Sequence, residues 1–298
     1  MQITTRPASI KTKLFPILTI TALLFAAWAL PVYGQSANLT MGNPSQAKAD
    51  TSQKDNFLMD KDFFALSYNT SKGTPNWVSW RLAKTDLGTA PRFQFHPDED
   101  LPTGFNQITP RDYTGGGFDR GHMCPHSDRG ASDDMSDATF VMSNMIPQSP
   151  NVNQKAWAQL EAYCRDLVEK ENKTLYIIDG PAGQGGTGRN GKKQTVGTAH
   201  TVVVPAKCWK VIMVVDAGHG KDVSKVNDNT RLIAVIMPND MSVGEEWAGF
   251  RVSVKDVETL TGYKFFDKVS AAVIEPLKEV VDDEPITHAT PIHHGSGE

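Results

Sequence analysis

The chain has 298 residues, of which 39% are hydrophobic and 21% are charged, and this composition is typical of a globular protein with a sizeable core. Its formal net charge is −4, and the charge falls to −7 without the first 34 residues, which carry three positive charges and no negative one. A net acidic protein does not bind polyanions over its whole surface, so any site for an anionic ligand must be local.

The first 34 residues have the pattern of a secretory signal peptide. Three basic residues precede an apolar run over 14–30, and small residues follow it near Gly34. The run is shorter than the ~20 residues of a membrane span, and Pro16 interrupts it. We therefore predict cleavage at about residue 34 and a secreted or periplasmic protein without membrane attachment, with an uncleaved anchor as the alternative. Residues 35–58 are polar and are predicted to form a disordered linker.

The rest of the chain alternates between short apolar runs and loops. Runs rich in β-branched and aromatic residues predict strands at 64–70, 77–82, 138–144, 174–180, 202–205, 209–215 and 232–237. We expect 202–205 and 209–215 to pair as a hairpin. Helices are predicted at about 153–170 and 253–262, too few to alternate with the strands. This order predicts an α+β fold over residues 59–270, with a mainly antiparallel central sheet flanked by helices, and a disordered tail over 271–298.

The helix predicted at 153–170 carries polar groups on its apolar side. Cys164 lies on the apolar stripe and is interpreted as a buried small side chain. At about 100° per residue, Asn153 and Glu161 fall within the stripe and Arg165 lies at its edge. Burial of such groups without partners costs several kcal/mol, so they either satisfy one another or line a site. Glu161 and Arg165 have the i, i+4 spacing of an ion pair.

A second concentration of polar residues lies between Gly115 and Gly130. It places two histidines, two arginines, two aspartates and a cysteine among five glycines and a proline. The imidazole of His122 can accept a proton near neutral pH and is a candidate general base. His122, Cys124 and His126 alternate, which leaves a metal site as an alternative, but a fourth ligand is missing nearby and Pro125 interrupts the strand.

Charged residues around this stretch suit a phosphate ligand. Arg92, Arg111 and Arg120 accompany the motif in an otherwise acidic chain. Asp128 and Arg129 are predicted to form a pair in a surface turn. The chain lacks a serine or cysteine nucleophile flanked by a base, and it offers a histidine, amides, carboxylates and arginines instead. This inventory favours metal-assisted hydrolysis of phosphodiesters over acyl transfer.

Taken together, these segments resemble the DNA/RNA non-specific endonuclease family, whose active site is a ββα-metal motif. The resemblance rests on Asp-Arg-Gly-His at 119–122, Ser-Asn-Met at 143–145, Pro-Gln at 147–148, Asn-Gln at 153–154, Ala-Trp at 156–157 and Leu-Glu at 160–161. It spans about residues 60–268 and is strongest to secreted bacterial sugar-nonspecific nucleases. The tetrapeptide alone is a weak signal, whereas its combination with the Asn-Gln-x-Ala-Trp block at this separation is highly specific.

The resemblance implies roles for the residues at the matching positions. His122 corresponds to the general base that activates water. Asn153 corresponds to the direct protein ligand of one Mg²⁺, for which Mn²⁺ is a substitute, and Glu161 holds that ion through a water molecule. Arg165 corresponds to the arginine that stabilises charge in the transition state, and Asn144 to a further catalytic position.

Two arginines are implied to bind the substrate, namely Arg120 and, with more divergent flanks, Arg92. The implied reaction is hydrolysis of DNA and RNA, single- or double-stranded, with 5′-phosphate ends and little sequence preference. A proteinaceous inhibitor that protects the producing cell is a further candidate partner. The rival functions are a non-catalytic nucleic-acid-binding surface protein and a metal phosphodiesterase for small substrates.

Overall fold

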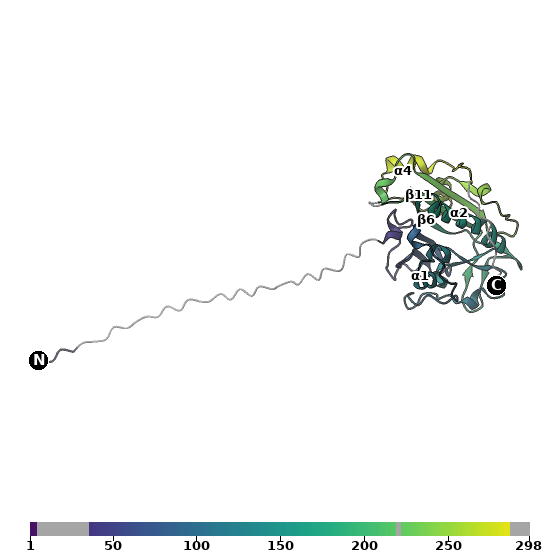
Figure 1. The fold of residues 1–298 in the computed structure, drawn as a ribbon. Coiled ribbons are helices and arrows are strands. Elements are labelled where there is room, and N and C mark those ends of the chain that lie inside the picture. Colours follow the sequence, from purple (N-terminus) through teal and green to yellow (C-terminus); the bar gives the residue numbers. More distant parts are fainter. Residues whose placement is uncertain (5–35, 219–221, 287–298) are drawn as a thin grey trace. The chain divides into compact units, whose positions relative to one another are not determined.

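The computed structural model describes residues 1–4, 36–218 and 222–286 of the chain (Figure 1). The predicted signal peptide, beyond its first four residues, lies outside the described residues. Among the residues that are described, no helix has the length and apolarity needed to cross a membrane.

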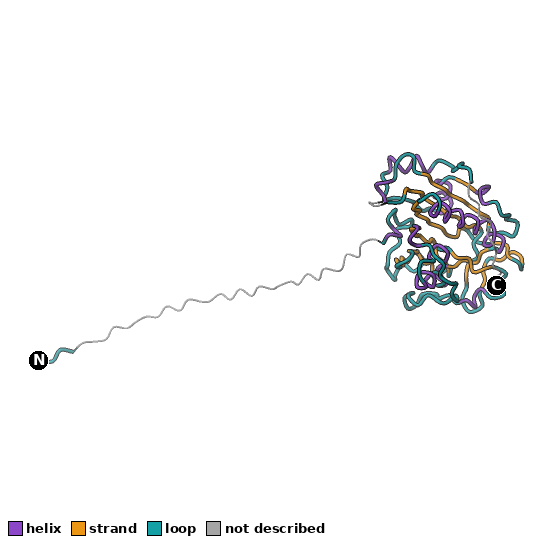
Figure 2. Tube along the Cα trace, in the orientation of Figure 1, coloured by secondary structure: helices purple, strands orange, loops and turns teal. Residues whose placement is uncertain are grey.

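The central element is a seven-stranded sheet in which every pairing is antiparallel (Figure 2). In spatial order, its strands are β1 (Phe57–Asp60), β2 (Ala65–Asn69), β3 (Thr74–Leu82), β6 (Lys173–Ala182), β11 (Lys207–Asp216), β12 (Arg231–Pro238) and β13 (Arg251–Val252). Three two-stranded ribbons accompany it: β4 (Asp119–His122) with β5 (Met145–Gln148), β7 (Gly186–Gly188) with β8 (Gly191–Lys193), and β9 (Thr195–Val196) with β10 (Val202–Val203). The predicted α+β class and antiparallel sheet are confirmed.

The helices are short apart from one. The α-helices are α1 (Asp133–Ala138), α2 (Ala158–Glu169), α3 (Val254–Thr261) and α4 (Ala271–Lys278), and a π-helix, η6 (Val152–Trp157), leads directly into α2. Short 3-10 turns lie at Ala37–Leu39, Lys84–Asp86, Pro110–Tyr113, His126–Arg129, Met142–Asn144, Asp222–Lys225 and Trp247–Phe250.

Both faces of the sheet are buried. Ile212 of β11 enters the apolar cluster beneath α2, which includes Cys164, whereas its neighbour Val211 enters the cluster beneath α3 and α4. This division follows from the strand, because successive side chains point to opposite faces. It also explains why the run at 209–215 is apolar at every position except Lys210 and does not alternate. The helix α2 packs against β6 (Figure 1).

The structure differs from the predicted linker at 35–58. Leu39, Met41 and Ala47 are buried against the sheet, and the Ser79 hydroxyl donates to the backbone oxygen of Asn38 at 2.7 Å. Asn43 makes reciprocal side-chain bonds with the backbone of Ala47, both at 2.9 Å. The polar residues that suggested disorder instead satisfy the backbone of tight turns, and three apolar side chains are enough to dock the segment.

The predicted disordered tail also begins with an ordered helix. Within α4, Ile274 is buried, and the ammonium group of Lys278 lies 3.0 Å from Glu258 of α3. Residues 287–298 of the predicted tail lie outside the described residues. The helix was overlooked because it is only two turns long and contains Pro276.

Two predicted strands differ from the structure. The Ser132 side chain accepts a bond from the Met135 amide and so starts the helix α1, which ends at Ala138. The chain then enters the 3-10 turn at Met142–Asn144, within the predicted strand 138–144. The apolar residues there are buried without forming a strand. The expected hairpin between 202–205 and 209–215 is also wrong, because β10 pairs with β9 while β11 pairs with β6 and β12.

Candidate active site

The ribbon of β4 and β5 carries the Asp-Arg-Gly-His motif. Asp119 lies opposite Gln148, and His122 lies opposite Met145. Gly121 permits this pairing, because a β-carbon at that position would come within 2.3 Å of the Gln148 side-chain oxygen. A larger residue would push the Gln148 side chain, which is fully buried, out of its place. The motif glycine therefore sets the backbone that holds His122.

The imidazole of His122 is walled by aromatic rings. Its ring centroid lies 4.9 Å from that of Phe140 and 5.4 Å from that of Phe95, and its Nε2 is buried with no hydrogen-bond partner in the described part of the chain. Burial, reinforced by the positive charge of Arg92 and by His126, lowers the pKa of His122 well below 6.5. The imidazole is therefore neutral at pH 7 and has a free nitrogen that can accept a proton.

Asn144 fixes the backbone next to the base. Its side chain is fully buried, and its amide nitrogen donates to the backbone oxygens of Cys124 and Thr139, both at 2.9 Å. Its amide oxygen accepts from the Cys124 backbone at 3.0 Å. Both ends of the amide are thus engaged within the fold. Asn144 therefore positions the strand end at His122.

Asp119 connects the ribbon to the π-helix η6. Its Oδ2 accepts hydrogen bonds from the side-chain nitrogens of Asn153, at 3.0 Å, and of Gln154, at 2.7 Å. Because the Asn153 nitrogen is held in this way, its amide oxygen is left facing away and accepts no bond from any described residue. The π-helical turn, a geometry that recurs at functional sites, brings Asn153 and Gln154 to one carboxylate. Sequence reasoning missed this role of Asp119, although the tetrapeptide contains it.

Behind η6 and α2 lies a buried ionic cluster centred on Lys210 of β11. Its ammonium group is 2.8 Å from a carboxylate oxygen of Asp179 and 4.0 Å from one of Glu161. The same group lies 4.4 Å from the ring centroid of Trp157 and 4.9 Å from that of Trp80. Lys210 was missed because it looks like a core position of a strand. Its signal was that it is the one charge within an otherwise apolar run at 208–215.

Glu161 and Arg165 reach different partners from the one their spacing suggested. Burial raises the pKa of Glu161 to about 7, against the opposing effect of the charges on Lys210 and Arg165. Arg165 forms an ion pair with Asp128 at 3.0 Å, and the second oxygen of that carboxylate accepts the indole N–H of Trp80 at 3.0 Å. Asp128 therefore positions Arg165.

The predicted surface pair of Asp128 and Arg129 is wrong, because both side chains are buried. Arg129 donates to the backbone oxygens of Phe63, at 2.7 Å, and Arg81, at 2.9 Å. Charged residues in a turn are usually solvated, but here the guanidinium satisfies backbone carbonyls and the carboxylate satisfies an arginine and an indole.

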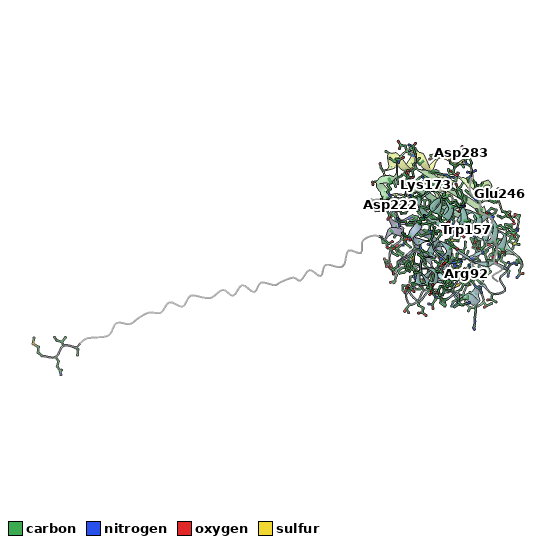
Figure 3. All side chains as sticks on the ribbon, in the orientation of Figure 1. Arg92, Trp157, Lys173, Asp222, Glu246 and Asp283 are labelled. Atoms are coloured by element: carbon green, nitrogen blue, oxygen red, sulfur yellow. The ribbon has the colours of Figure 1, made fainter. Side chains whose placement is uncertain are left out.

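Arg92 and Arg120 flank the aromatic wall of the base. The Arg92 guanidinium lies 5.4 Å from the ring centroid of Phe140, and that of Arg120 lies 5.2 Å from the ring centroid of Phe95. These are the two rings that contact His122. Figure 3 labels Arg92 on the segment before α1 and Trp157 at the start of α2. The structure thus brings both predicted substrate-binding arginines to the rings around His122.

The donor set fits a hard cation with few protein ligands. Among the described residues there is no group of three or more His, Cys, Asp and Glu side chains that could hold a metal ion, so the alternative site at His122, Cys124 and His126 does not form. All three cysteines are buried and free. The unpartnered amide oxygen of Asn153 and the carboxylate of Glu161, further along the same helical segment, are oxygen donors, which suit a Mg²⁺-like ion that keeps most of its water.

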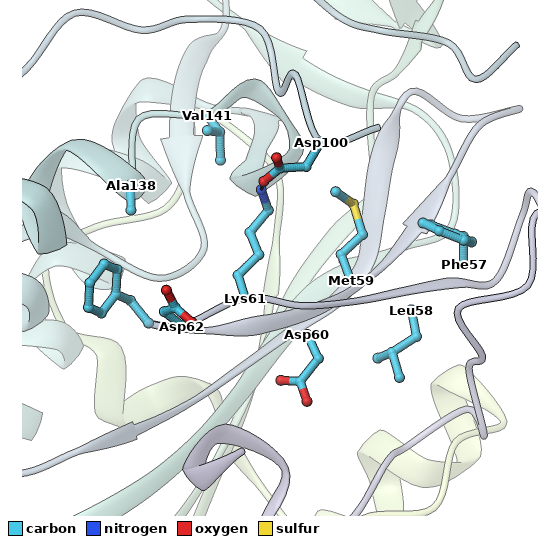
Figure 4. Close-up of a pocket in the computed structure, with 10 residues that line it drawn as sticks. Phe57, Leu58, Met59, Asp60, Lys61, Asp62, Asp100, Ala138 and Val141 are labelled. Carbon is cyan, nitrogen blue, oxygen red and sulfur yellow. Dashed lines mark hydrogen bonds and ion pairs between the residues drawn. The ribbon is translucent and has the colours of Figure 1, made fainter. Parts of the chain in front are cut away.

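A cavity of about 530 Å³ lies elsewhere, beside β1 (Figure 4). Its lining includes Phe57, Met59 and Val141, together with Lys61, which forms ion pairs with Asp98 at 2.8 Å and with Asp100 at 2.6 Å. None of the site residues described above lines it. The site is therefore the surface formed by β4, η6 and the start of α2.

A neutral histidine on a two-stranded ribbon, followed by a helix that supplies an amide and a carboxylate, defines a ββα-metal hydrolase. The family model for DNA/RNA non-specific endonucleases matches residues 41–272. The chain belongs to the DNA/RNA non-specific endonuclease family. It is an enzyme that hydrolyses the phosphodiester bonds of nucleic acids, and enzymes of this family depend on a metal ion.

Relatives with known names agree. A nuclease of Nostoc sp. is 43% identical over 249 residues, which cover 83% of this chain and 87% of that protein. The human mitochondrial nuclease EXOG is 33% identical over 210 residues, or 68% of this chain, but the match covers only 55% of the human protein. The structure of an EndoG/EndoGI complex, described as showing the mechanism of EndoG inhibition, has a TM-score of 0.64 and 26% identity. It covers 79% of this chain and 92% of the matched chain.

Proposed function

We propose that this protein is a secreted, Mg²⁺-dependent endonuclease that cleaves DNA and RNA with little sequence preference and leaves 5′-phosphate ends. One observation carries the proposal: the Nε2 atom of His122 is buried, unpartnered among the described residues and part of a ring whose pKa lies well below 6.5. Such a nitrogen is unprotonated at neutral pH and has no bond within the described fold, so it is available to accept a proton from a water molecule, as hydrolysis of a phosphodiester requires.

Each side chain of the site has a distinct task in this scheme. His122 removes the proton from the attacking water, a contribution of ~10²–10⁴-fold to the rate. Arg165, held by Asp128, and Arg92, beside the wall of the base, offset the negative charge that builds up on the phosphoryl oxygens. Arg120 binds the substrate next to them.

Asn153 would hold the cation directly, and Glu161 would hold it through a water molecule. When bound, Mg²⁺, or Mn²⁺ in its place, would supply positive charge at the scissile phosphate and at the leaving 3′-oxygen. Because an amide is neutral, Asn153 would leave the charge of the ion undiminished, and Asp119 would keep the amide oxygen turned toward it.

The remaining parts of the proposal follow from chemistry and from the N-terminal sequence. Arginines that contact phosphate carry no base code, so the enzyme cuts with little sequence preference. The signal pattern at residues 1–34 supports export, which would protect the nucleic acids of the producing cell. A protein inhibitor of the kind named for the EndoG/EndoGI structure would add a second protection.

A plasmid-nicking assay of the purified mature protein tests the proposal. We expect cleavage of DNA and of RNA with Mg²⁺ or Mn²⁺, loss of cleavage in EDTA, and products whose ends a DNA ligase rejoins without prior kinase treatment. N-terminal sequencing of protein from the culture medium should begin near residue 35. Failure to degrade either nucleic acid with both metals would overturn the enzyme assignment. Cleavage of small phosphodiesters alone would favour the phosphodiesterase alternative.

A further inference from the structure

The ribbon of β7 and β8 carries three cations, of which Arg189 lies next to the candidate active site. Arg189 occupies its turn with 57% of the side chain exposed, and Lys192 and Lys193 follow on β8. Lys192 is exposed and Lys193 is partly exposed, and as successive residues of a strand they point to opposite faces of the ribbon. Neither forms an ion pair with any residue that the structure describes, although the charge of Lys192 helps to lower the pKa of Asp240. Such a concentration of exposed positive charge contrasts with the net charge of −4 for the whole chain.

The glycine run at 115–117 docks this ribbon against β4. The Arg189 backbone N–H donates to the Gly117 oxygen at 2.8 Å, and the Asn190 side chain donates to the Gly115 oxygen at 3.2 Å. A β-carbon on Gly117 would come within 2.8 Å of the Asn190 nitrogen, and one on Gly188 within 2.3 Å of the Gly117 oxygen. The run is therefore the surface on which the ribbon of β7 and β8 sits.

Docking brings the Arg189 side chain to the residue that orients the proposed metal ligand. One of its guanidinium nitrogens lies 3.4 Å from Asp119 Oδ1, while Asp119 Oδ2 holds the side-chain nitrogen of Asn153. An exposed ion pair of this kind contributes only about 0–1 kcal/mol to stability. A guanidinium has five donors in a planar fork, so most of them remain free for a ligand. The ligand that suits exposed arginine and lysine side chains beside a phosphodiester site is a further phosphate.

We propose that Arg189, Lys192 and Lys193 form a second phosphate-binding surface, which holds the nucleic-acid backbone beyond the scissile phosphate. The inference rests on the proposed function, since it assigns residues that bind the polymeric substrate of the same site. The surface contacts phosphates and sugars only, which agrees with a lack of sequence preference. Its anchoring to β4 through backbone bonds means that removal of the side chains leaves the ribbon in place.

Salt dependence of binding measures the number of phosphates that a protein neutralises. Each contact adds about 0.7–0.9 to the slope of log K against log salt concentration. The experiment measures the affinity of the full mature protein for a fluorescent 20-nucleotide DNA in EDTA, so that no cleavage occurs, across a series of NaCl concentrations. We expect Arg189→Ala to lower the slope by about 0.7–0.9, and the double variant Lys192→Ala/Lys193→Ala by up to about twice that amount.

The matched control is Lys264→Ala/Lys268→Ala, which removes two exposed lysines from the segment between α3 and α4. It should leave the slope unchanged. In cleavage assays with Mg²⁺, Arg189→Ala and the Lys192/Lys193 double variant should raise KM for long DNA several-fold and leave kcat within about twofold.

Two results would overturn the inference. One is that all the ribbon variants have the same salt slope of binding and the same KM as the wild-type protein. The other is a change in the Mg²⁺ requirement of Arg189→Ala without a change in the salt slope, because the side chain would then act through Asp119. An inactive wild-type protein whose binding still shows these slopes would contradict the proposed function and leave the inference standing.

Discussion

The base and the carboxylate of this site use burial in opposite ways. His122 is enclosed by the rings of Phe95 and Phe140, whereas Glu161 lies beside the ammonium group of Lys210. Burial favours the neutral form of both groups, so it lowers the pKa of His122 well below 6.5 and raises the pKa of Glu161 to about 7. The neutral form is the working form of a base, and an apolar wall is therefore sufficient there. A carboxylate works when it is ionised, so its region also needs buried cations.

The largest effect is expected at the base. His122→Ala should lower kcat by ~10²–10⁴-fold, because the water then has no side chain to take its proton. Single-turnover cleavage of plasmid DNA at saturating Mg²⁺ measures this step. His126→Ala is the matched control, since its ring lies 6.3 Å from that of His122 and affects the base only through its part in lowering the pKa of His122. We expect less than a tenfold change for the control, and equal losses in both variants would contradict the assignment of the base.

Substitutions in the region around Glu161, Asp179 and Lys210, here called the carboxylate region, should change the stability of the protein most strongly. Lys210→Met removes the ammonium group that lies 2.8 Å from Asp179 and leaves two buried carboxylates without it. We expect a loss of ~3–5 kcal/mol in the free energy of unfolding, measured with urea in the absence of metal. The double variant Lys210→Met/Asp179→Leu should recover part of this loss, because it removes both charges of the closest pair. Additive losses in the double variant would argue against the ion pair.

A smaller effect is expected at Asp119, where the ribbon of β4 and β5 meets η6. Asp119→Ala releases the side-chain nitrogen of Asn153, so the amide oxygen is no longer oriented. The Mg²⁺ concentration for half-maximal activity should rise ~10–100-fold, with a much smaller change in rate at saturating metal. Gln154→Ala serves as the control, because it removes the second bond to the same carboxylate at 2.7 Å and leaves Asn153 in place. An unchanged metal requirement in Asp119→Ala would show that the hydrogen bond does not orient the amide.

The sequence predicted His122, Glu161 and Arg165 as site residues, but it did not predict the partners that surround them. The strand pattern was enough for the antiparallel sheet, and the spacing on the helix was enough to place Glu161 and Arg165 near its apolar face. Their actual partners, Lys210 and Asp128, come from distant segments, and helix spacing reveals only neighbours three or four residues apart. Tertiary packing selected these partners over the local pair.

The π-helix explains why the bond between Asp119 and Asn153 was not predicted from the sequence. The position of Asn153 on the helix face was predicted with 3.6 residues per turn, but residues 152–157 form a wider π-helix. The spacing of apolar residues does not indicate a π-helix. The bond from Asp119 to Asn153 depends on that turn and on the pairing of β4 with β5, so it was visible only in three dimensions. The order in 36–58 was missed for a related reason, because the few apolar side chains there gain their stability from a sheet formed later in the chain.

Burial of Glu161 should make the free energy of unfolding depend on pH. The pKa of Glu161 is about 7 in the folded state, against 4.5 for an unperturbed glutamate. Below pH 4.5 both the folded and the unfolded protein carry the proton, so ionisation costs nothing. As the pH rises from 4.5 to 7, the unfolded chain loses the proton first, and the folded state becomes less stable until the penalty is complete above pH 7.

Glu161→Gln removes this penalty. In metal-free protein it should raise the free energy of unfolding by ~1–3 kcal/mol at pH 8 and by little at pH 4.5, while it lowers nuclease activity. Urea unfolding in EDTA at the two pH values measures the difference. Glu169→Gln, at an exposed position of the same helix, should change stability by less than about 0.5 kcal/mol at either pH. A destabilised Glu161→Gln at pH 8 would mean that Lys210 and Arg165 more than offset the cost of burial, and that this region, like the base, is stable in its working form.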